Sequence, residues 1–125
     1  MPKKLLLIDD DPEMLGLETA ILTEDGFEVD TASDGPEGIG KLEANKYDGI
    51  VLDVMMPRMD GYETAKRIQE LAFHKKTPIV MVTGVTERGA LAQGFAAGVV
   101  VFMHKPFNPA MFRSAIQGVV GGPAE

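Results

Sequence analysis

Short apolar runs of strand length, separated by helical segments, constrain this chain most. Four such runs lack polar alternation, which is typical of strands in a parallel sheet that is covered on both faces. A fifth segment alternates apolar and acidic side chains and indicates an edge strand with one wetter face. The apolar runs are residues 5–8, 49–52, 79–82 and 99–103, and the alternating segment is residues 27–31.

The segments between these runs carry helix signals. An aspartate, Asp11 or Asp9, can cap a first helix, and we expect Met14, Leu17 and Ile21 to form its apolar face. Strand and helix then alternate five times, which predicts a single (βα)5 three-layer α/β sandwich with a parallel sheet. The further helices are expected at about residues 36–45, 62–73 and 87–97, and after Asn108.

Length and composition indicate one acidic domain. The 125 residues suit a single domain, expected at residues 1–120, with residues 121–125 as a tail or the start of a linker. The lack of cysteine excludes disulfides and thiol chemistry, and a reducing cytoplasm is the expected location. A net charge of −7 excludes a general attraction to nucleic acid or anionic lipid, and no apolar run is long enough for a membrane span.

Polar side chains follow the predicted strands where each strand ends. Asp9 and Asp10 follow the first strand, Asp53 the third, and Thr83 and Lys105 the last two. The carboxyl ends of parallel strands meet at one edge of the sheet, where ligands bind. Carboxylates about 4 Å apart repel by on the order of 4 kcal/mol at an effective dielectric of about 20, so they take up a proton or a cation. Hard oxygen ligands favour Mg²⁺.

Such a magnesium site suits phosphoryl transfer. A carboxylate beside Mg²⁺ can attack phosphorus and form an aspartyl phosphate. The reaction mainly needs positioning and neutralisation of charge on the phosphoryl oxygens, to which the Lys105 ammonium and the Thr83 hydroxyl can contribute. Asp53 is the candidate nucleophile because it follows a central strand and lies between the other groups.

The order and spacing of these residues resemble the receiver domain of two-component response regulators, over nearly the whole chain. The resemblance implies a flavodoxin-like fold with strand order 2-1-3-4-5, and the edge character of residues 27–31 agrees with that order independently. The matching motifs are Asp9-Asp10, Asp53 with the Pro57 to Gly61 loop, Thr83-Gly84 and Lys105-Pro106-Phe107.

The resemblance also implies how Mg²⁺ and the phosphoryl group are held. Asp53 would be the phosphoacceptor and a metal ligand, Asp10 would bind Mg²⁺ directly, and Asp9 would bind it through water. Met55 would bind the ion through its backbone carbonyl, so its side chain need not be polar. Asp11 would be the helix cap rather than a ligand.

Further residues are implied to act in switching. Thr83 would bind the phosphoryl group and move with it. Lys105 would pair with Asp53 before transfer and with the phosphoryl group afterwards, aimed by a cis bond to Pro106. Phe102 would change rotamer as Thr83 moves, through packing alone, because it has no hydroxyl.

The implied function is a phosphorylation-dependent signalling switch. A histidine kinase or phosphotransfer protein would supply the phosphoryl group, and the domain would catalyse its own phosphorylation and dephosphorylation without being a turnover enzyme. The apolar run at residues 99–103 favours contact with another surface. We therefore expect helix four, strand five and helix five to form the partner surface, with a homodimer as one occupant and no direct contact with nucleic acid.

Other functions fit less well. A Mg²⁺-dependent phosphatase of the haloacid dehalogenase type needs an acid/base aspartate two residues after the nucleophile, where this chain has Met55. A flavodoxin-like cofactor carrier needs a phosphate loop, and Asp9, Asp10 and Asp11 would repel phosphate. A degenerate receiver that only binds other proteins stays open. The two histidines, His74 and His104, are expected to be ordinary surface residues.

Overall fold

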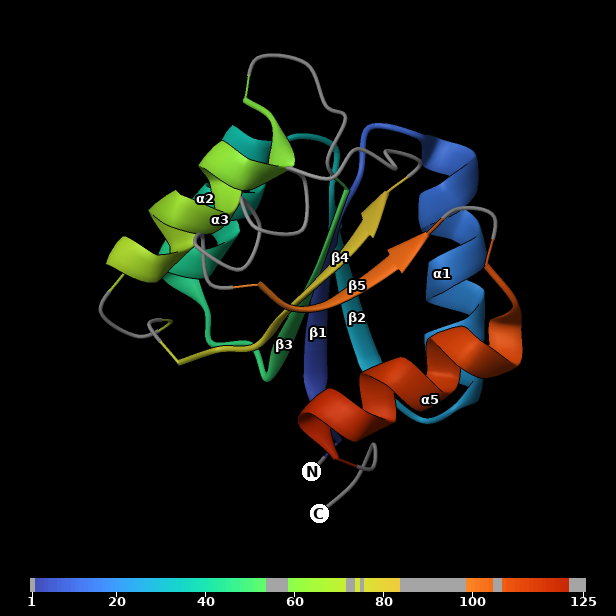
Figure 1. The fold of residues 1–125 in the computed structure, drawn as a ribbon. Coiled ribbons are helices and arrows are strands. Elements are labelled where there is room, and N and C mark those ends of the chain that lie inside the picture. Colours follow the sequence, from blue (N-terminus) through green and yellow to red (C-terminus); the bar gives the residue numbers. More distant parts are fainter. Residues whose placement is uncertain are drawn as a thin grey trace.

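A computed structural model of the chain describes residues 2–53, 59–71, 74, 76–83, 99–104 and 107–121, with the backbone alone for Thr83, Val100 and His104. Strands and helices alternate along the described residues, as expected, apart from the stretch between the last two strands (Figure 1). The strands are β1 (Lys4–Ile8), β2 (Glu28–Ala32), β3 (Gly49–Asp53), β4 (Ile79–Thr83) and β5 (Val99–His104). The helices are α1 (Pro12–Glu24), α2 (Gly35–Ala44), α3 (Gly61–Glu70) and α5 (Pro109–Val120). The helix expected at 87–97 lies outside the described residues.

The sheet confirms the expected strand order. It runs β2-β1-β3-β4-β5, and every neighbouring pair is parallel. All five residues of β3 are buried, as the continuous apolar run predicted, whereas β2 at the edge is only half-buried over most of its length. Successive side chains of a strand point to opposite faces, so the central strands supply apolar residues to two cores.

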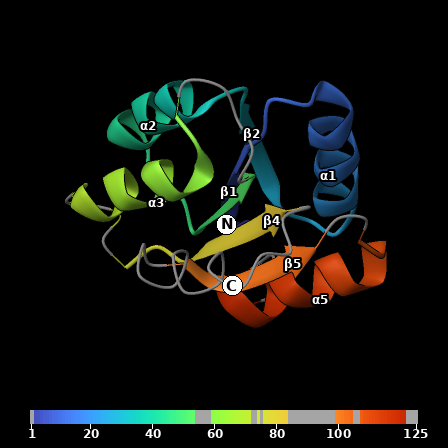
Figure 2. The same ribbon diagram turned by 45° about the horizontal axis from the view of Figure 1, so that its top comes forward.

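Helices cover both faces of the sheet, which completes the three-layer sandwich. Figure 2 shows α1 and α5 on one face and α2 and α3 on the other. Leu5 and Leu7 of β1 belong to the core under α1 and α5, and Leu6 and Ile8 belong to the core under α2 and α3. No helix among the described residues is both long enough and apolar enough to cross a membrane.

The predicted apolar face of α1 is wrong in part. Ile21 is buried as expected, but the Leu17 side chain is 47% exposed, and Glu18 and Leu22 are buried in its place. Two neighbouring rows of a helix both satisfy a spacing of three to four residues. Because Glu18 lies in the buried row, the sequence pattern pointed to the adjacent apolar row.

The prediction for His74 is also wrong. Its side chain is only 1% exposed, and both ring nitrogens have hydrogen-bond partners. A polar side chain can be buried at little cost when its hydrogen-bonding groups are satisfied. The side chain of His104 lies outside the described part of the chain.

Candidate functional site

Two buried aspartates lie side by side at the carboxyl ends of the central strands. Asp9 directly follows β1, and Asp53 is the last residue of β3. These strands are hydrogen-bonded neighbours, with Ile8 paired to Leu52. The residue that follows each of these two, Asp9 or Asp53, therefore lies at the same edge of the sheet. Asp9 is 2% exposed and Asp53 is 6% exposed. The parallel sheet therefore brings together residues 44 positions apart in the sequence.

Asp10 completes a cluster of three carboxylates. One oxygen each of Asp9, Asp10 and Asp53 lie within 4.8 Å of one another, and Asp10 is exposed to solvent. Asp9 also accepts a hydrogen bond from the backbone N–H of Asp11 at 2.9 Å, which orients its carboxylate. Three carboxylates at this separation favour a divalent cation, and an all-oxygen set open to water on one side suits Mg²⁺.

The structure describes only some of the other predicted site residues. Thr83 is the last residue of β4, the strand next to β3, so its backbone lies at the same edge as Asp53. Phe102 lies in β5, paired with Met81, and is half-buried against the core under α2 and α3. Met55, Lys105 and Pro106, as well as the Thr83 side chain, lie outside what the structure describes.

Three helices begin at this edge, and each is capped by an aspartate that accepts a hydrogen bond from the backbone N–H of a glutamate. Asp11 caps α1 by accepting from the N–H of Glu13 at 3.0 Å, which settles the choice between Asp9 and Asp11 as the cap. In α2 and α3 the capping aspartate likewise accepts from a glutamate N–H in the first turn. The pairs are Asp34 with Glu37 at 2.8 Å and Asp60 with Glu63 at 2.9 Å.

Asp34 and Asp60 are not among the caps predicted from the sequence. The signal is present, because in each case a glutamate follows the aspartate three residues later at the start of an apolar helix face. Negative charge at a helix N-terminus is stabilised by the helix dipole. The helix starts therefore tolerate a high density of carboxylates around the three central aspartates.

Comparison with known proteins identifies the family. Residues 5–117 match the family model described as "Response regulator receiver domain". The alkaline phosphatase synthesis transcriptional regulatory protein PhoP of Bacillus subtilis is 38% identical over 122 residues, which cover 96% of this chain and 49% of the relative. The transcriptional regulatory protein ResD of the same organism is 42% identical over 107 residues, or 85% of this chain and 43% of the relative. The chain thus spans less than half the length of these curated relatives.

Solved structures show the same fold. The chemotaxis protein CheY4 of Vibrio cholerae superposes with a TM-score of 0.92 at 34% identity, covering 95% of this chain and 99% of that one. The receiver domain of sensor histidine kinase PA1611 from Pseudomonas aeruginosa has a TM-score of 0.89 at 26% identity, covering 98% and 100%, and holds a magnesium ion coordinated in its active site cleft. By family match, sequence relatives and fold together, this chain belongs to the receiver domains of two-component response regulators.

Proposed function

We propose that this receiver domain accepts a phosphoryl group on Asp53, with Mg²⁺ bound at the edge of the sheet, and passes the change to a partner surface. The observation that carries the proposal is the meeting of Asp9, Asp10 and Asp53 within 4.8 Å. Asp53 is the acceptor because it ends a fully buried central strand beside β1 and β4. Its buried position at the end of a strand suits a nucleophile that has to be aligned with phosphorus.

The donor is a phosphorylated histidine of a histidine kinase or phosphotransfer protein. A carboxylate oxygen of Asp53 forms a new P–O bond while the P–N bond to the donor histidine breaks. The departing nitrogen keeps the electron pair of that bond and takes a proton, so the donor returns to neutral histidine. When bound, Mg²⁺ offsets negative charge on the phosphoryl oxygens.

The chain's own residues hold the ion and the product. Asp10 and Asp53 would bind the ion directly, Asp9 would bind it through water, and Met55 would contribute its backbone carbonyl. In the product, Lys105 and the hydroxyl of Thr83 contact the phosphoryl group. Movement of Thr83 changes the packing of Phe102, whose side chain in β5 is half-buried.

This proposal assigns residues 1–120 to the domain and residues 121–125 to a tail or linker. Its location is the cytoplasm, which the absence of cysteine supports.

The experiment that tests the acceptor is phosphorylation by acetyl phosphate with Mg²⁺, followed by intact mass measurement. We expect one phosphoryl adduct on the unaltered protein, and no adduct after Asp53→Asn or after chelation of Mg²⁺. Asp11→Asn is the matched control, because asparagine caps a helix as well as aspartate does and Asp11 is not a proposed ligand. An adduct that persists in Asp53→Asn would place the acceptor elsewhere, and no adduct at all would favour a receiver that only binds other proteins.

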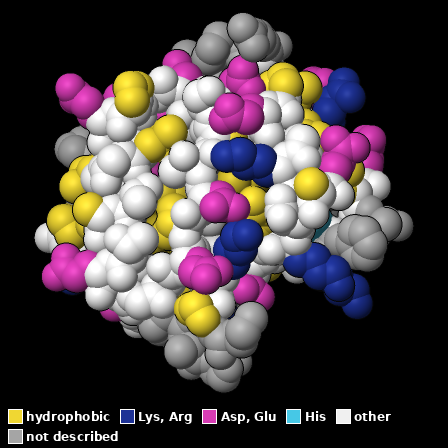
Figure 3. Space-filling view, turned by 180° about the vertical axis from the view of Figure 1, so that it is seen from behind, with side chains coloured by type: hydrophobic (Ala, Val, Ile, Leu, Met, Phe, Trp, Pro, Cys, Tyr) yellow, Lys and Arg dark blue, Asp and Glu magenta, His cyan; other side chains and the backbone are white. Residues whose placement is uncertain are grey.

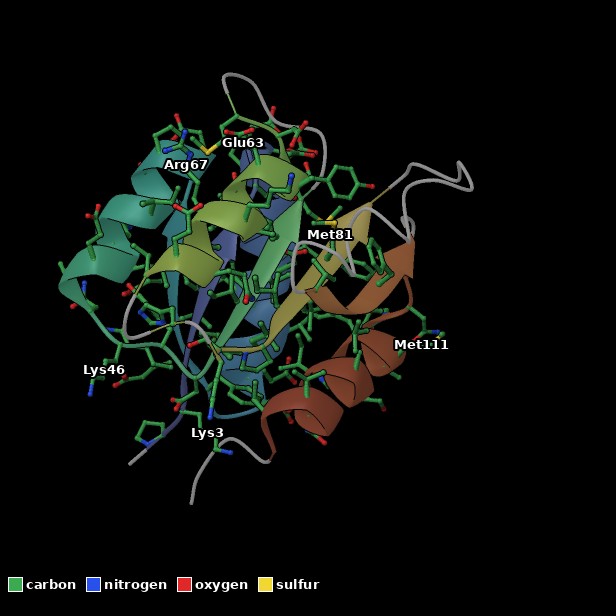
Figure 4. The ribbon with its side chains drawn as sticks, turned by 60° about the vertical axis from the view of Figure 1, so that its left-hand side comes forward. Lys3, Lys46, Glu63, Arg67, Met81 and Met111 are labelled. Atoms are coloured by element: carbon green, nitrogen blue, oxygen red, sulfur yellow. The ribbon has the colours of Figure 1, made fainter. Side chains whose placement is uncertain are left out.

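The proposed partner surface is formed by helix four, β5 and α5, with a second copy of the chain as its occupant. Val101 and Phe102 of β5 are only half-buried, and Met111 of α5 is 65% exposed at the outer side of that helix (Figure 4). Helix four falls in the residues that the structure does not describe. A half-buried apolar edge strand beside an exposed apolar helix residue favours association.

Sedimentation tests this surface. We expect phosphorylation to raise the fraction of dimer, and Met111→Lys to lower it by placing a charge in the contact. Leu17→Lys is the matched control, because Leu17 is the other large exposed apolar side chain recorded and lies on α1. A phosphorylated protein that stays monomeric at high concentration contradicts the dimer, and equal effects of the two lysine variants contradict the surface.

A further inference from the structure

A buried histidine lies at the opposite end of the sheet from the aspartates, in the connection between α3 and β4. The His74 side chain is 1% exposed and takes no part in the chemistry proposed above. It lies beside the ring of Tyr47, with 6.4 Å between the ring centroids and an angle of 35° between the planes. A histidine this deeply buried is unusual unless its polar atoms have partners.

Both ring nitrogens of His74 are hydrogen-bonded to other segments. Nε2 lies 3.1 Å from the carbonyl oxygen of Leu42 and 3.0 Å from that of Asn45. Because carbonyl oxygens only accept hydrogen bonds, Nε2 carries the proton and donates to both. Nδ1 lies 2.9 Å from the hydroxyl oxygen of Thr77, which donates to it when the ring is neutral.

These bonds join segments that are distant in the sequence. Leu42 lies in the last turn of α2, where a carbonyl has no partner within the helix, and Asn45 is the C-cap residue of that helix. Thr77 lies two residues before β4. The backbone N–H of His74 donates to the carbonyl of Leu71 at 3.0 Å, which is the C-cap residue of α3. One imidazole thus bonds the end of α2 to the segment that links α3 to β4.

The other end of α2 is held to α3 by close packing. A Cβ atom at Gly35 would overlap the Thr64 hydroxyl oxygen and would lie 3.3 Å from Met59 atoms, so the backbone of α2 lies directly on these side chains. Thr64 is itself fixed by donating to the carbonyl of Asp60 at 2.8 Å. The layer of α2 and α3 is therefore connected at both ends.

We propose that His74 is a latch that keeps the end of α2, the end of α3 and the entry to β4 as one rigid unit. Because three hydrogen bonds of one buried imidazole close it, this unit stays closed whether or not Asp53 carries a phosphoryl group. Structural change then starts at the carboxyl end of β4 and spreads toward β5 rather than into α2 and α3. The path of this structural change rests on the proposed function, whereas the latch itself does not.

Two measurements test the latch. The ring N–H of His74 should exchange slowly with water and give an observable proton resonance in the ¹⁵N-labelled protein, which disappears in His74→Leu. Amide hydrogen exchange in His74→Leu should accelerate at Asn45 and Thr77 on the order of tenfold or more, because the segments that hold these amides in hydrogen bonds to Lys41 and residue 74 lose their connection and open more often. His74→Gln should restore part of the protection, because its side-chain amide can donate to the same carbonyls.

A matched control separates the latch from general loosening. Gln117→Ala removes the hydrogen bond from Gln117 to Asp25, at 2.5 Å, which joins α5 to α1. It should leave exchange at Asn45 and Thr77 unchanged. If His74→Leu does not fold, Thr77→Val is the milder test, because it removes only the partner of Nδ1 and should speed exchange of the ring N–H.

The outcomes distinguish the latch from the phosphorylation proposal. Absence of a slowly exchanging ring proton, or equal exchange in His74→Leu and the unaltered protein, overturns the latch. With acetyl phosphate and Mg²⁺, the ring resonance should keep its position while the amides of β5 shift. If the mass adduct forms and the ring resonance is lost or strongly shifted, the rigid unit is wrong while phosphorylation stands. If no adduct forms, the phosphorylation proposal is wrong. The exchange measurements on the His74 and Thr77 variants then test the latch by themselves.

Discussion

At the scale of single residues, the hydrogen bond between Tyr47 and Asp30 sets the charge of both side chains. The buried Tyr47 hydroxyl donates to Asp30 Oδ2 at 2.7 Å, and this bond is the main cause that holds the pKa of Asp30 below its usual value of 3.8. Lys4 adds to it from 3.4 Å. Burial, together with the bond to Asp30, raises the pKa of Tyr47 well above its usual value of 10.0, so the phenol stays neutral.

Tyr47→Phe should lower the free energy of unfolding at neutral pH by about 1 kcal/mol, because Asp30 is partly exposed and water replaces much of the lost bond. A carboxyl group whose pKa is lowered in the folded state stabilises the protein above its unfolded pKa, and this contribution is lost as the pH falls through the folded pKa. The difference between Tyr47→Phe and the unaltered protein should therefore shrink in acid below pH 3.8. Urea unfolding between neutral pH and strong acid measures it, and a difference that does not change with pH contradicts this account.

At the scale of elements, two of the three glycines of α2 pack in opposite ways. Gly40 is exposed, and a Cβ atom there would meet nothing within 4 Å. Gly38 is buried, and a Cβ atom there would lie 2.5 Å from Ile8 Cδ1 in β1. Glycine within a helix costs about 1 kcal/mol relative to alanine wherever it occurs. At Gly38 the lower helix stability is offset by packing, because the missing side chain lets α2 approach β1. At Gly40 no packing contact offsets it.

Gly40→Ala should raise the free energy of unfolding by roughly 0.5–1 kcal/mol, through the lower backbone entropy of the unfolded chain. Gly38→Ala is the matched comparison on the same helix and should destabilise by about 1–3 kcal/mol, because the Ile8 side chain has to move within a packed core. Thermal or urea unfolding of both variants decides the matter. Two changes of the same sign would show that the spacing of α2 from β1 is not limited by Gly38.

At the scale of the whole molecule, acidic side chains are concentrated at one end of the strands. Among the described residues they crowd the carboxyl end of the sheet, whereas lysines and carboxylates are mixed at the amino end. Figure 4 shows Glu63 near the start of α3, and Lys3 and Lys46 at the other end of the molecule. Seen from the β2 edge, acidic and basic side chains alternate down the middle of the surface (Figure 3). The acidic residues at the carboxyl end are Asp9, Asp10, Asp11, Glu13, Asp34, Glu37, Asp53, Asp60 and Glu63.

The acidic carboxyl end of the sheet predicts how salt affects phosphorylation. Acetyl phosphate is an anion, so the acidic end repels it, and its rate of reaction at constant Mg²⁺ should rise with ionic strength as that repulsion is screened. The double variant Glu13→Gln with Glu37→Gln should raise the rate at low salt by about threefold and have no effect at high salt.

The control for that prediction changes the net charge equally at the opposite end. Glu43→Gln with Glu70→Gln neutralises two exposed glutamates near the C-terminal ends of α2 and α3. Its rate should stay close to that of the unaltered protein. Equal effects of the two double variants would mean that net charge, rather than its position, governs the reaction.

The sequence by itself determined the order of the elements, the parallel sheet and the edge at which Asp9, Asp10 and Asp53 meet. These features follow from local periodicity and from a rule that holds for every parallel α/β sheet. The sequence also allowed Asp11 and Asp9 equally as the cap of α1, and only the observed hydrogen bond to Glu13 separated them.

Tertiary structure alone decided which row of α1 is buried and what His74 does. Leu17 and Glu18 exchange their expected environments because the packing of α1 on the sheet and α5 selects between two rows that local spacing cannot distinguish. The partners of His74 Nε2 lie 32 and 29 residues away in the sequence. Neither periodicity nor composition encodes a contact at that separation, because it exists only once α2 and the connection to β4 have packed together.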